Sequence, residues 1–156
     1  MTPASHVFAN CIVDRFTRGQ LMDLTEMYAT PVAVYFGDRI LVLQSREDLH
    51  AALSSYRSIL VRAGLAFIQT TVMGTPRFAQ ARFSMRVRNT YFDQNGHAFD
   101  DCEVTYFIER DATCDYAPKI RLAEYDRWPC EDEVAAAEAL RQLETPTPRG
   151  SRAILF

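Results

Sequence analysis

Two neighbouring segments of the sequence carry polar side chains on a face that should be apolar. Residues 88–109, RNTYFDQNGHAFDDCEVTYFIE, predict two strands joined by a tight turn at Asn95-Gly96. Alternate residues of a strand point to the same side of a sheet, so one side of this hairpin is apolar in its middle. Near the turn, that side ends in four polar residues: Asn89, Tyr91, Asp100 and Cys102. Such an end to a covered apolar face is a candidate site for acid–base chemistry.

Two carboxylates are the candidate catalytic residues. Asp100 shares the covered face, and Glu124 joins it if the last strand keeps the same alternation. The alternative for Asp100 is a solvated position at the rim of the sheet. The candidate ligand-binding residues are side chains of the same face: Tyr35, Phe83, Met85, Asn89, Tyr91 and Tyr106. Tyr35 and Tyr106 could donate hydrogen bonds to a carbonyl group, although strand tyrosines more often fill core volume.

The other reactive side chains show no metal or nucleophile pattern. The four cysteines lie far apart without a C-x-x-C unit, and the three histidines have no ligand spacing relative to them. Cys102 has no histidine beside it in the sequence, so we expect an inert, buried thiol. Lys119 is the only lysine and has no desolvating pocket around it, which disfavours Schiff-base chemistry. We therefore expect neither a metal nor a cofactor.

The opposite side of the predicted hairpin is rich in charge. A tight turn would place Arg88 opposite Glu103 and Arg82 opposite Glu109. Cross-strand pairs of this kind contribute about 0.2–1 kcal/mol each. The arginines therefore predict a charge-matched sheet face, with anion binding as the alternative.

Composition places the chain among soluble globular proteins. Its 156 residues are 48% hydrophobic and 24% charged, which predicts one domain over residues 1–144 followed by a tail, 145–156. The net charge of −3 disfavours nucleic-acid and anionic-membrane partners, because both select a basic surface. The first residues lack a basic segment before an apolar core, and no apolar run approaches a membrane span, so we expect a cytoplasmic protein.

Hydrophobic spacing predicts the elements that must position these residues. Three- and four-residue steps indicate a helix at 6–18 and a shorter helical piece at 21–28. A hairpin follows at 31–44, and Ser45 then caps the next helix, which ends at Gly64. Alternation indicates four antiparallel strands, with turns at Gly74-Thr75-Pro76, at Asn95-Gly96 and around Asp115. The predicted ranges, ending with a C-terminal helix, are 66–73, 78–92, 98–110, 119–128 and 131–144.

This order of elements resembles the nuclear-transport-factor-2-like (NTF2-like) superfamily, in particular its SnoaL-like branch. LMDLTEMYATPVAVYFGD is similar to the family's entry into its first strand, SREDLHAALSSYRSILVRAG to its third helix, and KIRLAEYDRW to its closing strand. The resemblance covers about residues 6–128. It implies an α+β cone, a curved sheet wrapped around N-terminal helices, with an internal pocket and commonly a homodimer. Family enzymes often place an Asp or His where the first strand begins, whereas this chain has ATPVAVYF there.

Three functions fit these patterns. The first is a small-molecule-binding protein, extending to a cofactor-free acid–base enzyme of isomerase, cyclase or dehydratase type that acts on a hydrophobic carbonyl compound. In that version Asp100 or Glu124 is the base and a tyrosine is the electrophilic donor. The second is a non-catalytic homodimeric module whose cone is filled by its own aromatics, such as the ten phenylalanines. The third, implied by the resemblance, is the small subunit of a ring-hydroxylating oxygenase.

Overall fold

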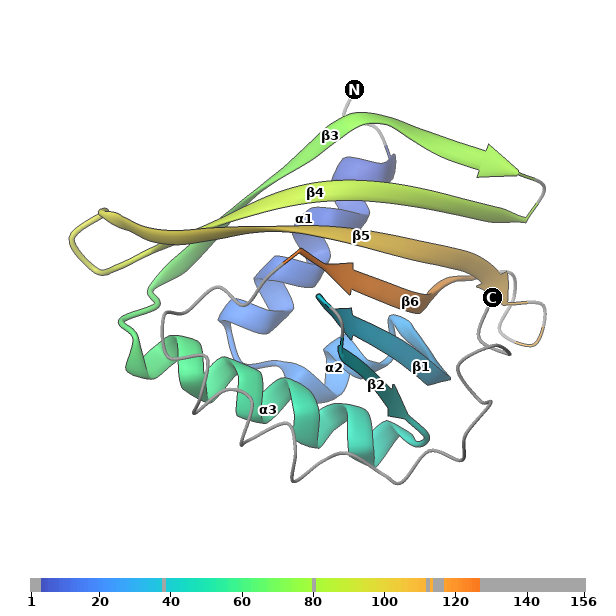
Figure 1. Cartoon of the computed structure of the whole chain (residues 1–156), viewed down its shortest axis with the longest axis horizontal. Coiled ribbons are helices and arrows are strands. Elements are labelled where there is room, and N and C mark those ends of the chain that lie inside the picture. The colour runs from blue at the N-terminus through green and yellow to red at the C-terminus, as the bar shows by residue number, and fades with distance from the viewer. Residues whose placement is uncertain (1–3, 38, 80, 112, 114–116, 127–156) are drawn as a thin grey trace.

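The computed structural model describes residues 4–37, 39–79, 81–111, 113 and 117–126 of the chain. Helices and strands follow one another along this part in the order shown in Figure 1. The helices are α1 (Ala4–Thr17), α2 (Leu21–Thr25) and α3 (Arg46–Arg62). The strands are β1 (Tyr28–Phe36), β2 (Arg39–Leu43), β3 (Phe67–Ala79), β4 (Arg82–Phe92), β5 (Ala98–Asp111) and β6 (Ala117–Tyr125).

The strands form one mixed sheet in the order β2-β1-β6-β5-β4-β3. Neighbouring strands pair antiparallel, except that β6 lies between β1 and β5 and runs parallel to β1. The sequence pattern missed this parallel pair, because it joins segments at opposite ends of the described chain. Figure 1 shows the long strands β3, β4 and β5 curving over α1, with α2 and α3 below. The predicted α+β cone, with a curved sheet around N-terminal helices, is confirmed.

The helices form where the hydrophobic spacing predicts them. In α1 the buried residues Ala9, Ile12 and Phe16 follow three- and four-residue steps. The Oγ of Ser45 accepts a hydrogen bond from the backbone N–H of Asp48 at 3.1 Å, which confirms the predicted cap of α3. The second helix is shorter than predicted, because α2 ends at Thr25 and the chain has already entered β1 at Tyr28.

The turn predicted at Gly74-Thr75-Pro76 is wrong. β3 continues through these residues to Ala79, and the connection to β4 lies between Ala79 and Arg82. The pairing of β3 with β4 shifts register between Met73 and Arg77, and Gly74 has a φ of +66° in this irregularity. A bulge at an edge strand tolerates both a glycine with positive φ and a proline without an N–H donor.

The predicted pairing of β4 with β5 is confirmed. Arg88 lies opposite Glu103 and Arg82 opposite Glu109. The connection is longer than the predicted two-residue turn, because β4 ends at Phe92, β5 begins at Ala98, and the register shifts between Tyr91 and Phe92. The guanidinium of Arg88 donates to Glu103 Oε1 at 2.7 Å, and that of Arg86 donates to Glu103 Oε2. These hydrogen bonds hold the pKa of the Glu103 carboxyl below its usual range. The charged side of the hairpin is therefore matched along most of its length.

In β6, the alternation of inward and outward side chains that the sequence predicts does not hold over the whole strand. The pairing of β5 with β6 shifts register between Phe107 and Ile108, so that Ile108 pairs with Ile120 but Tyr106 pairs with Ala123. From that point on, the residues of β6 that face the interior are the odd-numbered ones. Tyr125 therefore pairs with the fully buried Val104.

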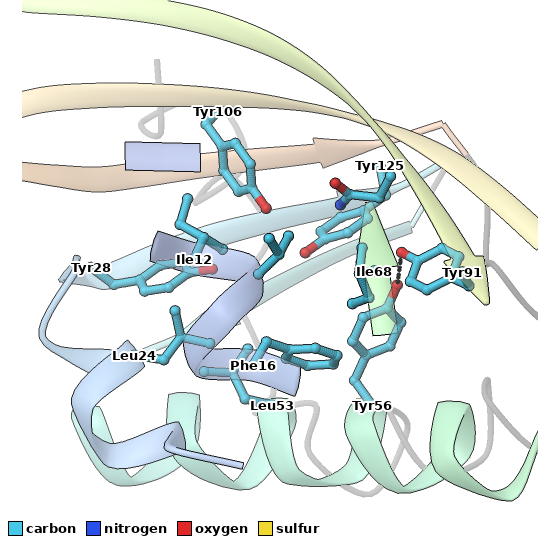
Figure 2. Close-up of a pocket in the computed structure, with 12 residues that line it drawn as sticks. Ile12, Phe16, Leu24, Tyr28, Leu53, Tyr56, Ile68, Tyr91, Tyr106 and Tyr125 are labelled. Carbon is cyan, nitrogen blue, oxygen red and sulfur yellow. Dashed lines mark hydrogen bonds between the residues drawn. The ribbon is translucent and has the colours of Figure 1, made fainter. Parts of the chain in front are cut away.

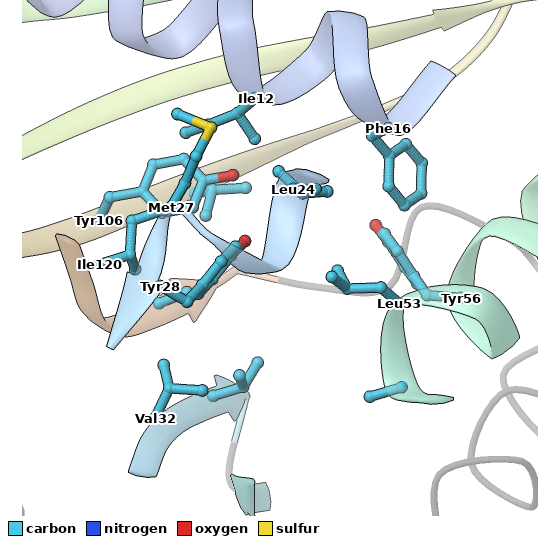
Figure 3. Packing of buried hydrophobic residues seen from close by; sticks show 14 of the residues in the cluster. Ile12, Phe16, Leu24, Met27, Tyr28, Val32, Leu53, Tyr56, Tyr106 and Ile120 are labelled. Carbon is cyan, nitrogen blue, oxygen red and sulfur yellow. The ribbon is translucent and has the colours of Figure 1, made fainter. Parts of the chain in front are cut away.

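The core lies between the concave side of the sheet and the three helices. Val32, Leu60, Val104 and Ile120 have no exposed surface. Figure 3 shows side chains of α1, α2, α3 and several strands packed together in this cluster. The predicted C-terminal helix, 131–144, and the tail, 145–156, lie outside the described residues. Across the described helices, none is long and apolar enough to span a bilayer.

Candidate functional site

A small cavity lies inside the cone, between the helices and the concave face of the sheet. Figure 2 shows tyrosine side chains from α3 and from four different strands or strand ends reaching into it. The cavity volume is about 30 Å³, which holds one or two water molecules. The residues that share a polar tip here, called the five cavity tyrosines below, are Tyr28, Tyr56, Tyr91, Tyr106 and Tyr125.

A second cavity of similar volume, about 30 Å³, lies on the other side of an aromatic wall. Tyr28, Tyr56 and Tyr125 line both cavities, together with Leu53. The ring of Tyr125 stacks on Phe36 with centroids 4.9 Å apart and meets Tyr56 edge-on at 5.9 Å. The interior of the cone is thus divided in two by side chains, not by backbone.

A chain of hydrogen bonds connects the cavity to the sheet. The hydroxyl groups of Tyr56 and Tyr91 are 3.3 Å apart, and the Tyr91 hydroxyl is 3.0 Å from the Sγ of Cys102. Burial raises the pKa of all five cavity tyrosines above their ordinary value of 10.0. They therefore stay protonated at neutral pH and act as hydrogen-bond donors and acceptors, not as bases.

Two buried oxygen atoms next to each other lack hydrogen-bond partners. Asn89, which lines the cavity, is 5% exposed, and its Oδ1 has no partner. Thr70 lies directly opposite Asn89 in the pairing of β3 with β4, and its Oγ1 is also buried without a partner. A buried acceptor without a donor costs about 1–3 kcal/mol, so native structures rarely keep one without a reason.

Three of the residues expected at a ligand site line the cavity: Asn89, Tyr91 and Tyr106. Met85 is buried in the core but lines neither cone cavity. Phe83 packs beside the core and lines a different pocket, near the connection of β3 to β4.

The remaining expected residues lie away from the cavity. Glu124 pairs with Thr105 and is exposed, because the register shift in β6 turns it to the outer face. Tyr35 pairs with Glu124 across β1 and β6, so its side chain also leaves the interior. Asp100 lies opposite Tyr91 near the β4–β5 turn, half-buried, and its Oδ1 accepts the backbone N–H of Asp101 at 2.8 Å. It does not line either cone cavity.

Sequence reasoning missed three of the five cavity tyrosines. Tyr56 lies on α3, and only the packing of this helix brings its hydroxyl group within reach of Tyr91. Tyr28 was assigned to a helix, although it begins β1. Tyr125 takes the inward position that alternation gave to Glu124. The signal that could have found them is the abundance of tyrosine among otherwise apolar core positions.

The chemistry available in the cone is limited. Asp, Glu and His are absent from the described residues that line the two cavities. Within the described ranges, no group of three or more His, Cys, Asp or Glu side chains could hold a metal ion. The cavity lining offers neutral hydroxyl groups, one residue with an amide oxygen that lacks a donor, and apolar walls.

No protein-family model matches the sequence, and no curated protein matches it. Solved structures do match, among them a domain of unknown function with a cystatin-like fold from Nostoc punctiforme. It is 12% identical, with a TM-score of 0.61 and coverage of 99% of this chain and 94% of that chain.

Two further structures carry more specific descriptions. An NTF2-like protein with a cystatin-like fold from Novosphingobium aromaticivorans is 12% identical, has a TM-score of 0.59, and covers 85% of this chain and 83% of its own. A ketosteroid isomerase-like protein from Erwinia carotovora atroseptica is 12% identical, with a TM-score of 0.56, over 77% of this chain and 90% of its own. At such low identity these likenesses establish the fold and no activity. The chain has the NTF2-like cone fold, also called cystatin-like.

Proposed function

We propose that the cone binds a compact, mostly apolar molecule that carries a hydrogen-bond donor. The observation that supports this proposal is the buried Oδ1 of Asn89, which has no hydrogen-bond partner although Asn89 lines a cavity rich in tyrosine hydroxyl groups. A ligand hydroxyl or N–H that reached this oxygen would remove a desolvation cost of about 1–3 kcal/mol, while the tyrosine hydroxyls could satisfy a second polar atom of the ligand.

Binding, not acid–base catalysis, is the function that the lining favours. A general base must be within hydrogen-bond reach of the proton that it removes. The expected bases, Asp100 and Glu124, are not among the residues that line the cavity. Tyrosine is already protonated at neutral pH at its ordinary pKa of 10.0, and burial raises the pKa of the five cavity tyrosines further. An enzymatic role for Asp100 stays a prediction, and it requires a substrate that extends from the cavity to the β4–β5 turn.

A ligand larger than water needs the aromatic wall to move. Tyr125 is half-buried and is the last residue of β6, so its side chain is our candidate for the part of the wall that moves. Rotation of Tyr125 away from Phe36 and Tyr56 would join the two cavities into one space. Apolar walls would then contact the body of the ligand, and Asn89 would fix its polar end.

The test compares two probes of nearly equal shape, phenol and anisole, because only phenol has a donor for Asn89. Calorimetric titration of the protein should show phenol binding about tenfold more tightly, since one hydrogen bond to a buried acceptor supplies about 1.4 kcal/mol. Asn89→Leu should abolish this preference. The exposed Asn10 on α1 provides the control, and Asn10→Leu should leave the preference intact. Equal binding of the two probes to the unaltered protein would contradict the proposal.

The second candidate is a non-catalytic homodimeric module whose cone is filled by its own aromatic side chains. The small volume of both cavities, about 30 Å³ each, supports it. Under this alternative neither phenol nor anisole binds or raises the melting temperature, and the protein has the mass of a dimer in native mass spectrometry. The phenol titration therefore separates the two candidates.

A further inference from the structure

A row of polar side chains crosses the concave face of the sheet beside the cavity. Thr70 of β3 pairs directly with Asn89 of β4, and Asn89 pairs directly with Cys102 of β5, so the three side chains lie on one face. At one end of this polar row, the Sγ of Cys102 lies 3.0 Å from the hydroxyl group of Tyr91. At the other end, Thr70 Oγ1 and Asn89 Oδ1 are both buried and have no hydrogen-bond partner within the described part of the chain. Two neighbouring strands thus each contribute one unsatisfied oxygen.

The two oxygens have different hydrogen-bonding capacities. The amide oxygen of Asn89 only accepts hydrogen bonds, whereas the hydroxyl group of Thr70 both donates and accepts. Residues directly opposite each other on one face of an antiparallel pair have Cβ atoms about 4.5–5.5 Å apart, so one atom between their side chains can contact both. The adjacent inward residues of β3, Ile68 and Val72, have no polar side-chain atom that could take this place. A complementary atom therefore comes from a molecule that enters the cone.

The cavity reaches the strands at this position. Asn89 and Ile68 both line it, and Thr70 lies two residues after Ile68 on the same side of β3. Thr70 does not itself line the cavity, so we assign it a contact with the polar end of the ligand and not with its apolar body.

We infer that Thr70 and Asn89 together select a ligand with a hydroxyl group, an alcohol or a phenol. This inference rests on the function proposed above and names the chemical class of its ligand. The ligand hydroxyl donates to Asn89 Oδ1 and accepts the hydroxyl hydrogen of Thr70, so one oxygen atom satisfies both residues. An ether oxygen accepts but cannot donate, and a hydrocarbon does neither, so such ligands leave one or both residues unsatisfied.

The test adds ethylbenzene to the phenol and anisole of the titration above, because ethylbenzene has the shape of anisole without its oxygen. Calorimetric titration of the full chain with each probe is repeated for Thr70→Val, in which a methyl group replaces the hydroxyl group. The variant should bind phenol and anisole each about fivefold more weakly, since each loses one hydrogen bond from Thr70, and it should bind ethylbenzene equally well. The preference for phenol over anisole, which depends on Asn89, should be unchanged.

Two further variants serve as controls. Thr71 is the next residue of β3, pairs with Arg88 on the opposite side of the sheet and is exposed, so Thr71→Val should change the affinity for none of the probes. Thr70→Ser keeps the hydroxyl group, so the ratio of its phenol affinity to its ethylbenzene affinity should equal that of the unaltered protein.

Failure of this inference is distinct from failure of the proposed function. If Thr70→Val weakened phenol, anisole and ethylbenzene equally, the inference would be overturned, because Thr70 would then have only a structural role. Unchanged affinity of Thr70→Val for all three probes would overturn it as well. In both cases the preference for phenol over anisole would still support the role of Asn89. Equal binding of phenol and anisole to the unaltered protein would overturn the proposed function, and this inference with it.

Discussion

Replacement of Asn89 by leucine should stabilise this protein, although a buried polar residue is usually costly to remove. Asn89 is 5% exposed, and its Oδ1 has no hydrogen-bond partner. Leaving such an oxygen unpaired costs about 1–3 kcal/mol, and leucine does not carry this cost. The extra volume of leucine enters a space that already has room, because Asn89 borders a cavity of about 30 Å³.

We expect the free energy of unfolding to rise by about 1 kcal/mol, after about 1 kcal/mol of the gain is lost to imperfect packing of the larger side chain. For a chain of this size, that change raises the melting temperature by about 2–4 °C. Urea denaturation followed by far-UV circular dichroism measures it. Asn10→Leu serves as the control, and since Asn10 is exposed its effect should stay within about 0.5 kcal/mol.

A loss of more than about 1 kcal/mol in Asn89→Leu would refute this reasoning, because such a loss means that Oδ1 is hydrogen-bonded in the folded protein. Thr70→Val offers an independent check, since valine has the shape of threonine and Thr70 Oγ1 is the neighbouring unpaired atom. A gain in stability together with loss of phenol preference would be the pattern expected of a binding residue, because functional sites commonly reduce stability.

Two further perturbations follow from buried polar groups. The folded protein retains the protons of the five cavity tyrosines to higher pH than the unfolded chain, because burial raises their pKa above 10.0. The contribution of these protonated tyrosines to the free energy of unfolding is thus fully present below pH 10 and declines above it, by up to about 1.4 kcal/mol per pH unit for each tyrosine. Urea titrations on both sides of pH 10 should show this decline, and a free energy of unfolding that does not change with pH would contradict it. Arg57 donates to the backbone oxygens of Phe16 and Thr17 at 2.9 and 3.0 Å, so Arg57→Met should lower the free energy of unfolding by about 2–3 kcal/mol, against no loss for the exposed Arg62→Met.

The parts of the fold that depend on local patterns could be predicted from the sequence. Ser45 with Asp48 marks the start of α3, and the turn signal at Asn95-Gly96 locates the hairpin of β4 and β5, in which Arg88 pairs with Glu103. Alternation stops being informative at a bulge, because one inserted residue exchanges the two faces of a strand. This is why the bulge after Met73 was taken for a turn, and why Glu124 was placed inside.

The candidate site was predictable only where it lies on one hairpin. Asn89, Tyr91 and Tyr106 belong to paired neighbours in β4 and β5, so their common face follows from alternation. Tyr56 reaches the same cavity from a helix, and its distance from Tyr91 depends on how α3 packs. The size of the cavity could not be predicted from the sequence either, because it depends on the rotamers of the aromatic side chains.

The position of β6 has a consequence for how this chain folds. β6 is the last described strand, yet it lies in the interior of the sheet and separates the β1–β2 hairpin from β3, β4 and β5. Its parallel pairing joins Tyr28 to Ile120, so the sheet cannot close until nearly the whole described chain is available. Contacts between such distant segments slow folding, because the loop entropy is lost before the contacts form. A growing chain that ends before β6 would hold two separate sheet fragments, and β6 would join them in the final step.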